Sequence, residues 1–521
     1  FTVRRMKLVL LLASVVFTFA GRKNILFMLV DDGGFELAPW GNNITRTPNI
    51  AKLADMGTVF ERAYTAVSSC SPSRSAILSG LPTHQNGMYG LHQFPGNFQS
   101  NPGTTSMPNI LNAAGYKTGV IGKYHVGPVD SYNFTYGLGQ PGTECWAGAA
   151  GCTVDGGYNM ATRNITFMKQ NARKFLQELE PNKPFFLYVG FGDCHRCKEH
   201  SALGAFCENY GADGSIPDWT PTRYTPDQVE VPPFMPDNPA SRQDIAGQYT
   251  AVDRMDAGVG VMLEEVRRAG QADNTLVIFF SDNGIPFPAG KTNLFSEQGM
   301  GEPLIVYDPT AAAAGRGAGA TVRSEVVSSL DFLPTVLDWT GTSYPPHASS
   351  GPNPASLLGS SLLPLLASSD SSTVWRDSAF ASHNFHSLYN YYPTRAVTAR
   401  VSAHHSAAKV QFRLVHNLNF HLTFGILEDL FDTPLWQGIQ AAAQAGKPTG
   451  WVYNYSQYMN RPEFQLFDVD KDPMGLHNLA GNGTYSDVLA TLKTQLAAWR
   501  KDSYDPWNQC NVPATAHECS I

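Results

Sequence analysis

Runs of apolar residues in the first two thirds of the chain alternate with segments that have helical character. Residues 24–30 form a continuous run dominated by apolar side chains, and further runs follow at 117–122, 184–191 and 276–280. Such runs are typical of strands buried on both faces of a parallel sheet. Residues 48–57 begin with Pro and end with Gly, and residues 241–269 have helical periodicity, so we predict helices there. The alternation predicts an α/β domain with a mostly parallel central sheet.

The composition changes after residue 342. Residues 342–372 are rich in Ser, Pro, Gly and Leu, which is typical of a loop-rich connection. Strand-like pieces follow between 379 and 424, including 410–416, and a helix is predicted near 486–501. We therefore expect a large α/β domain over residues 22–376 and a smaller α+β domain over residues 377–521.

The N-terminus resembles a secretory signal peptide. Arg4, Arg5 and Lys7 precede the apolar residues 8–19, and the small residues Ala20 and Gly21 follow. A membrane anchor is the alternative, but the apolar run is well short of the roughly 20 residues needed to span a bilayer. We predict a signal peptide over residues 1–20. Acceptor sequons for N-glycans agree with a secretory route; they begin at Asn43, Asn133, Asn164, Asn454 and Asn482.

The 8 cysteines include three pairs that lie close together in sequence. In an oxidising compartment each pair is suited to closing a short loop, although sequence alone does not fix the connectivity. The expected pairs are Cys145 with Cys152, Cys197 with Cys207, and Cys510 with Cys519. They leave Cys70 and Cys194 unpaired.

The charge pattern argues against nucleic acid as a partner. The net charge of -7 is mildly acidic, and the sequence has no basic stripe of the kind that nucleic-acid grooves need. An anionic substrate would therefore be met by a few local cations.

Polar residues follow two of the predicted strands directly. Asp31 and Asp32 come after the first strand, and Asp282 and Asn283 come after the strand at 276–280. Ligands of open α/β sheets bind at the carboxyl ends of strands, although Asp and Asn there also commonly act as turn or capping residues. Because these four side chains offer only oxygen ligands, a metal site built from them favours a hard cation such as Ca²⁺.

The motif Cys70-Ser71-Pro72-Ser73-Arg74, followed by a short helical stretch and Gly80, resembles the signature of the sulfatase family. A disulfide half or a buried thiol is the ordinary reading of an isolated cysteine. The resemblance implies instead that a formylglycine-generating enzyme oxidises Cys70 to Cα-formylglycine. One hydroxyl of the hydrated aldehyde attacks sulfur, and the second then expels sulfate. The resemblance also implies an alkaline-phosphatase-like fold and a calcium ion held by Asp31, Asp32, residue 70, Asp282 and Asn283.

Other segments supply the catalytic groups that this resemblance implies. Lys123 and His125 match the family's Gly-Lys-x-His segment, where Lys contacts the sulfate and His holds or activates a formylglycine hydroxyl. Arg74 is expected to steady the aldehyde hydrate. His195 matches a position that binds sulfate and protonates the leaving group, and Lys291 falls where the family places a cation near the sulfate. Without the Cys70 motif, we would interpret these residues as ordinary solvated or packed side chains.

Longer segments narrow the resemblance within the family. They resemble sulfatases that hydrolyse the N–S bond of N-sulfoglucosamine at the non-reducing end of heparan sulfate. Those enzymes are lysosomal homodimers, so the resemblance implies a lysosomal homodimer that is not bound to a membrane once the signal peptide is removed. The matching segments are 31–36, 68–74, 84–93, 216–221, 281–288, 413–420 and 505–507.

Several departures limit this comparison. Gly192 and Cys194 stand where these relatives usually have His and Pro, and Lys291 replaces an Arg, which loses a bidentate fork. Residues 402–409 also resemble an insertion. An O-sulfatase for another sulfated sugar or ester is therefore the main alternative. A non-catalytic carbohydrate-binding relative and a thiol hydrolase that uses Cys70 and His125 are two others.

Overall fold

A computed structural model describes residues 23–93, 95–138, 157–197, 203–313, 321–345, 357–367, 373–402 and 408–507. The larger of its two main sheets has seven strands in the order β4-β5-β1-β6-β7-β2-β8. Only β7 runs against its neighbours, so the sheet is mostly parallel, as predicted. The strands are β1 (Asn24–Val30), β2 (Thr58–Phe60), β4 (Lys117–Gly122), β5 (Phe185–Gly190), β6 (Thr275–Ser281), β7 (Leu304–Tyr307) and β8 (Thr321–Arg323).

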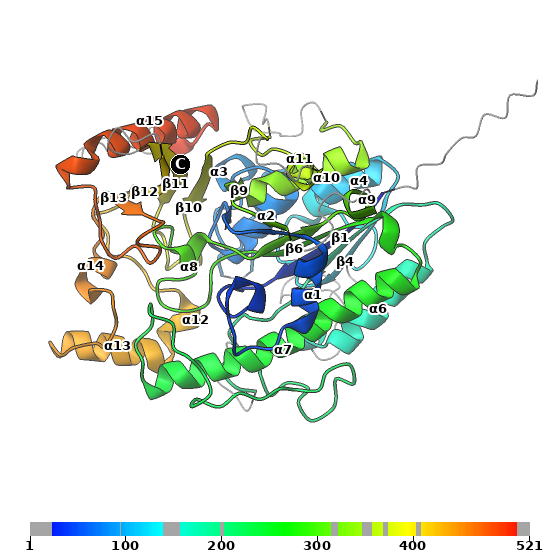
Figure 1. Cartoon of the computed structure of the whole chain (residues 1–521), viewed down its shortest axis with the longest axis horizontal. Helices are drawn as coiled ribbons and strands as arrows, with labels where there is room; N and C mark the ends of the chain where they lie inside the picture. Colours follow the sequence, from blue (N-terminus) through cyan, green and yellow to red (C-terminus); the bar gives the residue numbers. More distant parts are fainter. Residues whose placement is uncertain are drawn as a thin grey trace, which may run out of the picture.

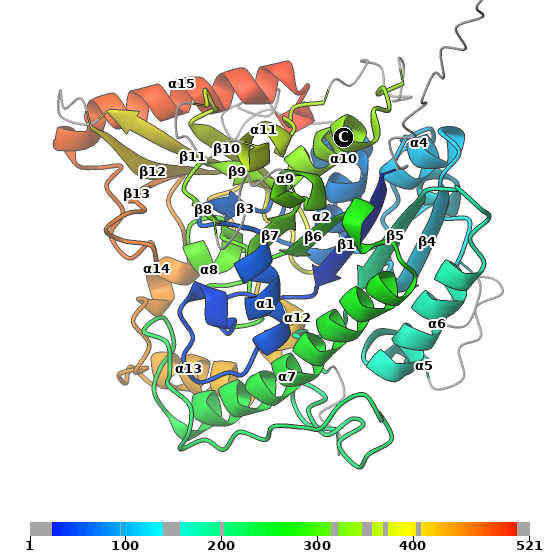
Figure 2. The same ribbon diagram turned by 45° about the vertical axis from the view of Figure 1, so that its right-hand side comes forward.

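Helices cover both faces of this sheet, and the apolar pattern of β1 explains why. Ile25, Phe27 and Leu29 point into a core that includes α2 (Cys70–Ser79), α4 (Met107–Ala113) and α10 (Phe332–Thr340). Leu26, Met28 and Val30 point to the other face, against α1 (Pro48–Met56), α6 (Ile165–Gln177) and α7 (Pro239–Arg268). Figures 1 and 2 show the two helical layers with the sheet between them. Strands buried on both faces explain the continuous apolar runs in the sequence.

The smaller sheet is antiparallel and lies in the C-terminal part of the chain. Its order is β10 (Ser378–His383), β11 (Thr394–Ser402), β12 (Lys409–Asn417) and β13 (Phe464–Asp468). The helix α15 (Ser486–Asp502) packs on one face, where Trp499 stacks on Phe380 with ring centroids 5.2 Å apart (Figure 1). The other face joins a core shared with the loop that follows β6. The α/β class with a smaller C-terminal α+β unit is therefore confirmed.

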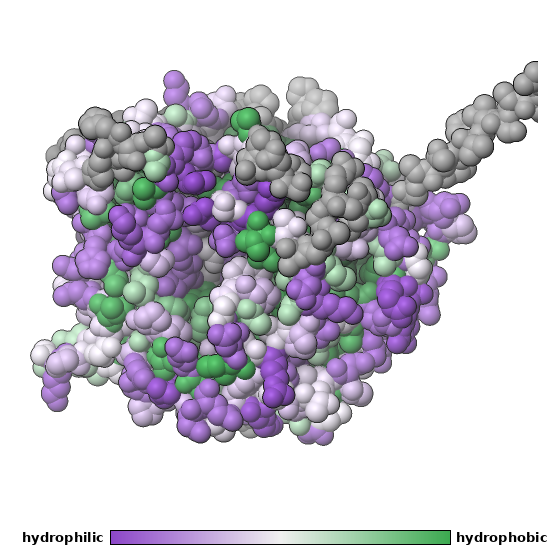
Figure 3. Space-filling model, viewed as in Figure 1, coloured by the Kyte–Doolittle hydropathy of each residue, from purple (hydrophilic) through white to green (hydrophobic). Residues whose placement is uncertain are grey.

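Short elements complete the chain. They are η1 (Ala38–Trp40), β3 (Ala63–Tyr64), α3 (Thr83–Asn86), η2 (Val129–Tyr132), α5 (Gly157–Thr162), η3 (Ala272–Asn274), α8 (Glu297–Met300), α9 (Pro309–Ala313), β9 (Val327–Ser328), η4 (Ser329–Asp331), α11 (Leu363–Ala367), α12 (Glu428–Phe431), α13 (Pro434–Gln444), α14 (Tyr455–Met459) and η5 (Gly483–Tyr485). Among the described helices, none has the combination of length and apolarity needed to cross a membrane. On the face seen in Figure 3, small groups of hydrophobic residues lie between hydrophilic ones.

Several predictions about cysteines and sequons can be compared with this fold. The Cys197–Cys207 disulfide is present, and Cys70 and Cys194 are free and buried. The other two predicted disulfides, the signal peptide and most of the 402–409 segment lie outside the described residues. Four sequon asparagines are exposed, but Asn164 is only 8% exposed and its side chain caps α6 by accepting from the Phe167 amide. That asparagine is therefore a poor glycan acceptor.

Candidate active site

The pairing of β1 with β6 brings the two acidic strand ends together. The strands are parallel, and Val30 lies opposite Ser281, so the residues that follow them meet at one edge of the sheet. The Asp32 amide donates to Asp282 Oδ1 at 3.3 Å, and Asn283 Nδ2 donates to Asp32 Oδ1 at 2.6 Å. Cys70, the first residue of α2, places its Sγ 3.7 Å from Asp31 Oδ1. Residues 250 positions apart thus form one cluster.

This cluster has the chemistry of a site for a hard cation. The ligand atoms of Asp31, Cys70 and Asp282 all lie within 4.8 Å of one another. The Oδ1 atom of Asn283 is buried and has no hydrogen-bond partner. Burial and the neighbouring carboxylate of Asp31 raise the pKa of Asp282 to about 7, although Arg74 opposes the shift. A divalent cation among these oxygens would offset the repulsion and satisfy the amide oxygen, so the residues fit a metal.

Arg74 lies one turn into α2 and is fully buried beneath the cluster. Its Nε donates to Asp282 Oδ2 at 2.8 Å, and its Nη2 lies 3.4 Å from Asp31 Oδ1. Its Nη1 donates to the Lys123 carbonyl at 3.0 Å. Arg74 therefore ties the ends of three strands together, and lysine cannot reproduce this fork of donors.

Two lysines form ion pairs with the carboxylates of Asp31 and Asp32. Lys123 Nζ lies 2.5 Å from Asp31 Oδ2, and Lys291 Nζ lies 2.9 Å from Asp32 Oδ1. Lys291 is fully buried and also lies 3.6 Å from Asp429 Oδ2. Burial opposes the charged form of both lysines, but the neighbouring carboxylates raise each pKa well above its usual range. Both side chains are therefore cations.

His125 lies in the loop after β4 and is held by a side chain that the sequence did not single out. Its Nε2 lies 2.5 Å from Gln93 Oε1, and its ring meets the His92 ring edge-on with centroids 5.4 Å apart. Burial lowers the pKa of His125 well below its usual range, and Lys123 and His92 reinforce the shift. The ring is therefore neutral, as a base or hydrogen-bond acceptor must be.

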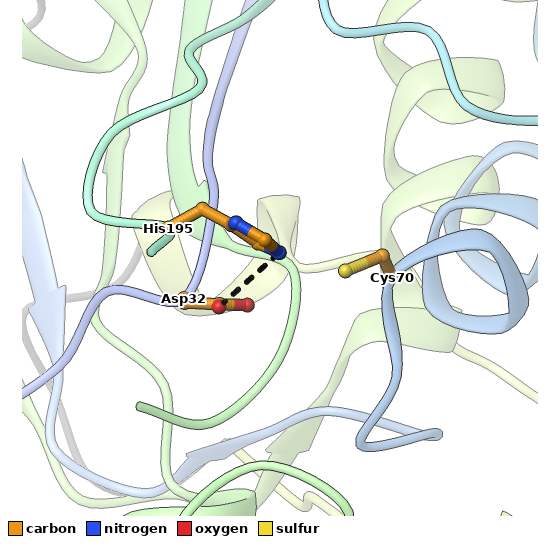
Figure 4. Close-up of side chains that lie close together, drawn as sticks. All are labelled: Asp32, Cys70 and His195. Carbon is orange, nitrogen blue, oxygen red and sulfur yellow. Dashed lines mark ion pairs between the residues drawn. The ribbon is translucent and has the colours of Figure 1, made fainter. Parts of the chain in front are cut away.

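His195 lies in the loop after β5 and faces the cluster, and Figure 4 shows its ring pointing toward Asp32 and Cys70. Its Nδ1 lies 2.7 Å from the carbonyl oxygen of Arg196, which only accepts, so Nδ1 carries a proton. Its Nε2 lies 3.2 Å from Asp429 Oδ2 and 3.9 Å from Asp32 Oδ2. Burial and Lys291 oppose protonation, but Asp429 and Asp32 raise the pKa of His195 to about 10.

Asp193 anchors the loop that carries His195. Its carboxylate accepts a hydrogen bond from Arg163 Nε at 2.9 Å. It also accepts hydrogen bonds from Arg254 Nε at 2.9 Å and from Arg254 Nη2 at 2.8 Å. All three side chains are buried. The main chain also clamps Asp31, since the Asp31 amide donates to the Asp193 carbonyl at 3.1 Å. This network fixes the β5 loop against the end of β1.

The structure gives physical reasons for two departures in this loop. A Cβ on Gly192 would meet Thr162 Oγ1 at 2.5 Å, so a larger residue requires Thr162 to move. Cys194 is buried in the core beneath helices α6 and α7, with its Sγ 3.3 Å from Glu36 Oε1. Cys194 therefore contributes to packing beside the site.

A cavity of about 350 Å³ opens above these groups, within the size range of small-molecule sites. Four basic side chains on its wall provide the local positive charge that an anionic ligand needs in an acidic protein: Lys123, Arg163, His195 and Arg196. Lys291 is not among the described residues of the wall. The polar residues of the wall include Cys70, Lys123, His125, His195, Arg196 and Asp429.

Sequence reasoning missed Gln93, Asp193 and Asp429. Asp193 lies two residues before His195, which was a weak signal. Gln93 ends a segment that resembles the family, but it lies 32 residues from His125, and nothing in the sequence linked the two. Asp429 lies in α12, a four-residue helix without a motif. Nothing in its local sequence indicates that it reaches His195.

Comparisons with known proteins bear on the family and the fold of this chain. Residues 23–342 match a family model described as Sulfatase. The chain is 43% identical to human N-sulphoglucosamine sulphohydrolase over 490 residues, which cover 93% of this chain and 91% of that protein. It is 25% identical to the N-acetylglucosamine-6-O-sulfatase of Bacteroides thetaiotaomicron, over 93% of this chain and 87% of that protein.

Solved structures share the fold at lower identity. One is described as a complex with its substrate D-glucosamine-2-N,6-O-disulfate; it has a TM-score of 0.63 and 18% identity, over 93% of this chain and 98% of that chain. A phosphonate monoester hydrolase from Silicibacter pomeroyi has a TM-score of 0.60 and 16% identity, over 95% of this chain and 98% of that chain.

Proposed function

The chain belongs to the sulfatase family, and from that premise we propose that it hydrolyses the N–S bond of N-sulfoglucosamine at the non-reducing end of heparan sulfate. The observation that carries the reaction class is the position of Cys70, beside an oxygen-rich cluster and on the wall of a cavity that also holds His125 and His195. The 43% identity to the human N-sulphoglucosamine sulphohydrolase supports the substrate.

Two groups complete the site in this proposal. A formylglycine-generating enzyme converts Cys70 to Cα-formylglycine, and Asp31, Asp32, Asp282 and Asn283 hold a calcium ion beside it. The hydrated aldehyde supplies one hydroxyl for attack on sulfur and a second whose deprotonation expels sulfate, while the ion supplies positive charge at the sulfate oxygens. The cation fit rests on the buried amide oxygen of Asn283 and the clustered carboxylates.

The basic side chains bind the sulfate in this proposal. Lys123 lines the cavity, and its ammonium group has three donors, so it is able to keep Asp31 and still donate to a sulfate oxygen. Lys291 adds positive charge from behind Asp32. Arg74 keeps the carboxylates in place and steadies residue 70 from one turn along the helix.

The two histidines divide the proton transfers. His125 is neutral and accepts the proton of a hydroxyl at residue 70, while Gln93 fixes its ring. His195 directs a protonated Nε2 toward the cluster, where it is placed to donate to the leaving nitrogen as the S–N bond breaks. The opposite pKa shifts of the two rings suit a base and an acid that work at the same pH.

The test uses the full chain, produced together with a formylglycine-generating enzyme. Peptide mass mapping around position 70 should show the aldehyde in place of the thiol, and the enzyme should release sulfate from N-sulfoglucosamine. The Cys70→Ala variant should fold and release none. An intact thiol at position 70 in an inactive, correctly folded protein would instead support a non-catalytic carbohydrate-binding relative.

An O-sulfatase is the second candidate, because Lys291 departs from the N-sulfatase pattern and a 6-O-sulfatase is among the relatives. Sulfate release from glucosamine 6-sulfate, measured beside N-sulfoglucosamine, separates the two. A higher kcat/KM for the 6-sulfate ester would favour the second candidate. Retained activity after chelation of divalent cations would favour a thiol hydrolase.

The proposal also includes location and assembly. We propose that the protein enters the secretory pathway, carries N-glycans at exposed sequons such as Asn43 and Asn482, and works in the lysosome as a homodimer. The boundary near residue 377, just before β10, divides its two domains in this proposal. Light scattering of the purified protein tests the dimer, and co-staining with a lysosomal marker tests the location.

A further inference from the structure

The strongest unassigned feature of the cavity is Asp429, a carboxylate that the C-terminal part of the chain contributes. Its side chain is 3% exposed and lines the cavity beside His195. It lies 3.2 Å from His195 Nε2 and 3.6 Å from Lys291 Nζ, and both contacts use Oδ2. The carboxylate therefore lies on the wall of the cavity next to two basic side chains.

The position of Asp429 relative to the leaving group follows from His195. A leaving atom that takes a proton from Nε2 must lie at hydrogen-bond distance from that nitrogen. Since Nε2 is 3.2 Å from Asp429, the leaving atom and the carboxylate share one small region of the cavity. Asp429 is not among the proposed calcium ligands, and a carboxylate that is not held by a metal repels the sulfate that the site must bind.

The identity of the leaving group resolves this conflict. When an N-sulfate is cleaved, the S–N bond breaks, sulfur passes to an oxygen at residue 70, and the nitrogen takes the Nε2 proton. The resulting amine takes a second proton from solvent and becomes an ammonium ion. An O-sulfate releases a neutral alcohol instead. Charge-assisted hydrogen bonds are roughly twice as strong as neutral ones, so a carboxylate favours the amine.

We propose that Asp429 is a specificity-determining residue that binds the nascent ammonium group and so selects N-sulfated over O-sulfated substrates. This inference rests on the proposed function. The charge balance of the site supports it: as His195 gives up its proton, Asp429 loses the cation at 3.2 Å, and the new ammonium ion takes its place. An ester leaves the carboxylate with Lys291 as its remaining cationic partner among these groups.

The first test compares two substrates in the full-length, formylglycine-containing enzyme. Asp429→Asn keeps the size of the side chain and removes its charge, and N-sulfoglucosamine is assayed beside glucose 2-sulfate, an ester of the same sugar framework whose alcohol also needs a proton to leave. We expect kcat for the N-sulfate to fall about ten- to a hundredfold more than kcat for the ester, the range of one charged hydrogen bond. An equal fall on both substrates, which a role only in positioning His195 predicts, would overturn the proposal, as would no fall.

Asp432→Asn is the matched control, because Asp432 is an exposed acid that follows the same short helix. It should leave both activities unchanged. The wild-type enzyme separates the two levels of inference: if it cleaves the ester but not N-sulfoglucosamine, the proposed function fails whatever Asp429 does. If it cleaves both and the variants do not differ in their ratio, only the role of Asp429 fails.

A product-inhibition measurement keeps the proposal testable if the Asn variant folds poorly. Glucosamine should inhibit the wild-type enzyme more strongly than glucose, from which it differs in carrying an amine. Asp429→Glu, which keeps the charge, should retain this preference, and any folded Asp429→Asn protein should lose it. Equal inhibition of the wild-type enzyme by the two sugars would contradict the proposal.

Discussion

Replacing Asp193 with Asn tests whether the buried ion-pair network holds the loop that carries His195. The carboxylate is 2% exposed and neutralises the guanidinium groups of Arg163 and Arg254, which are 1% and 0% exposed. Asn keeps the shape and one acceptor oxygen, which is able to retain two of the three hydrogen bonds. Its amide group, however, points donors at Arg254 Nε, and both cations lose their only anionic partner in this network.

The expected cost follows from that loss. Breaking a buried ion pair by removing one partner costs about 3–5 kcal/mol, because the remaining charge is left uncompensated. Arg163 and Arg254 keep bonds to the carbonyls of His195 and Tyr210, so we expect the lower half of that range, about 3 kcal/mol. The activity of the folded fraction should also fall, since the Asp193 carbonyl accepts from the Asp31 amide.

The assay is urea unfolding followed by tryptophan fluorescence, with midpoints converted through a common slope. Asp218→Asn is the matched control. It removes a carboxylate from a more accessible ion pair, with Lys169, in which both side chains are about 20% exposed. Salt bridges open to solvent contribute roughly 0–1 kcal/mol, so the shift should be smaller. A shift for Asp193→Asn no larger than that of Asp218→Asn would refute the reasoning.

Three further predictions concern the metal, the pH response and the loop after β5. Chelating divalent cations should abolish sulfate release and lower the thermal midpoint, and Asn283→Ala should require more calcium to recover both; an unchanged midpoint on chelation would contradict the site. Burial lowers the pKa of His84 to about 3, so below pH 6.5 the unfolded chain binds a proton that the folded chain does not. As the pH falls below 6.5, the free energy of unfolding should therefore decrease by up to about 1.4 kcal/mol per pH unit. In His84→Gln the thermal midpoint should depend less on pH between 6.5 and 4. Gly192→Ala should cost about 1–3 kcal/mol through its contact with Thr162. Thr162→Ala removes the Oγ1 at 2.5 Å but keeps the Cβ at 2.9 Å, so it should restore part of the loss in urea unfolding.

Local patterns in the sequence determined most of the elements that position the site. The strand predicted at 117–122 is β4 (Lys117–Gly122), and the helix predicted at 241–269 is α7 (Pro239–Arg268). Burial on both faces produces apolar runs, and Pro and Gly mark the ends of helices, so these signals need no distant information. The Cys70 motif also indicated the family, because its residues have a fixed spacing within one short segment of the chain.

Tertiary structure decided which of these residues meet. The strand order β4-β5-β1-β6 places Lys123, His195, Asp31 and Asp282 at one edge of the sheet, and that order depends on how the helices pack. It also decided the partners of each charge: Arg74 binds the acidic cluster, and Lys291 lies between two carboxylates. Asp429 shows this most clearly, because its nearness to His195 depends on how the C-terminal part of the chain packs against the loops of the large sheet. Contacts between segments so far apart leave no periodic signal in either one, so the sequence predicted the chemistry of the site and the fold determined which carboxylate lies beside His195.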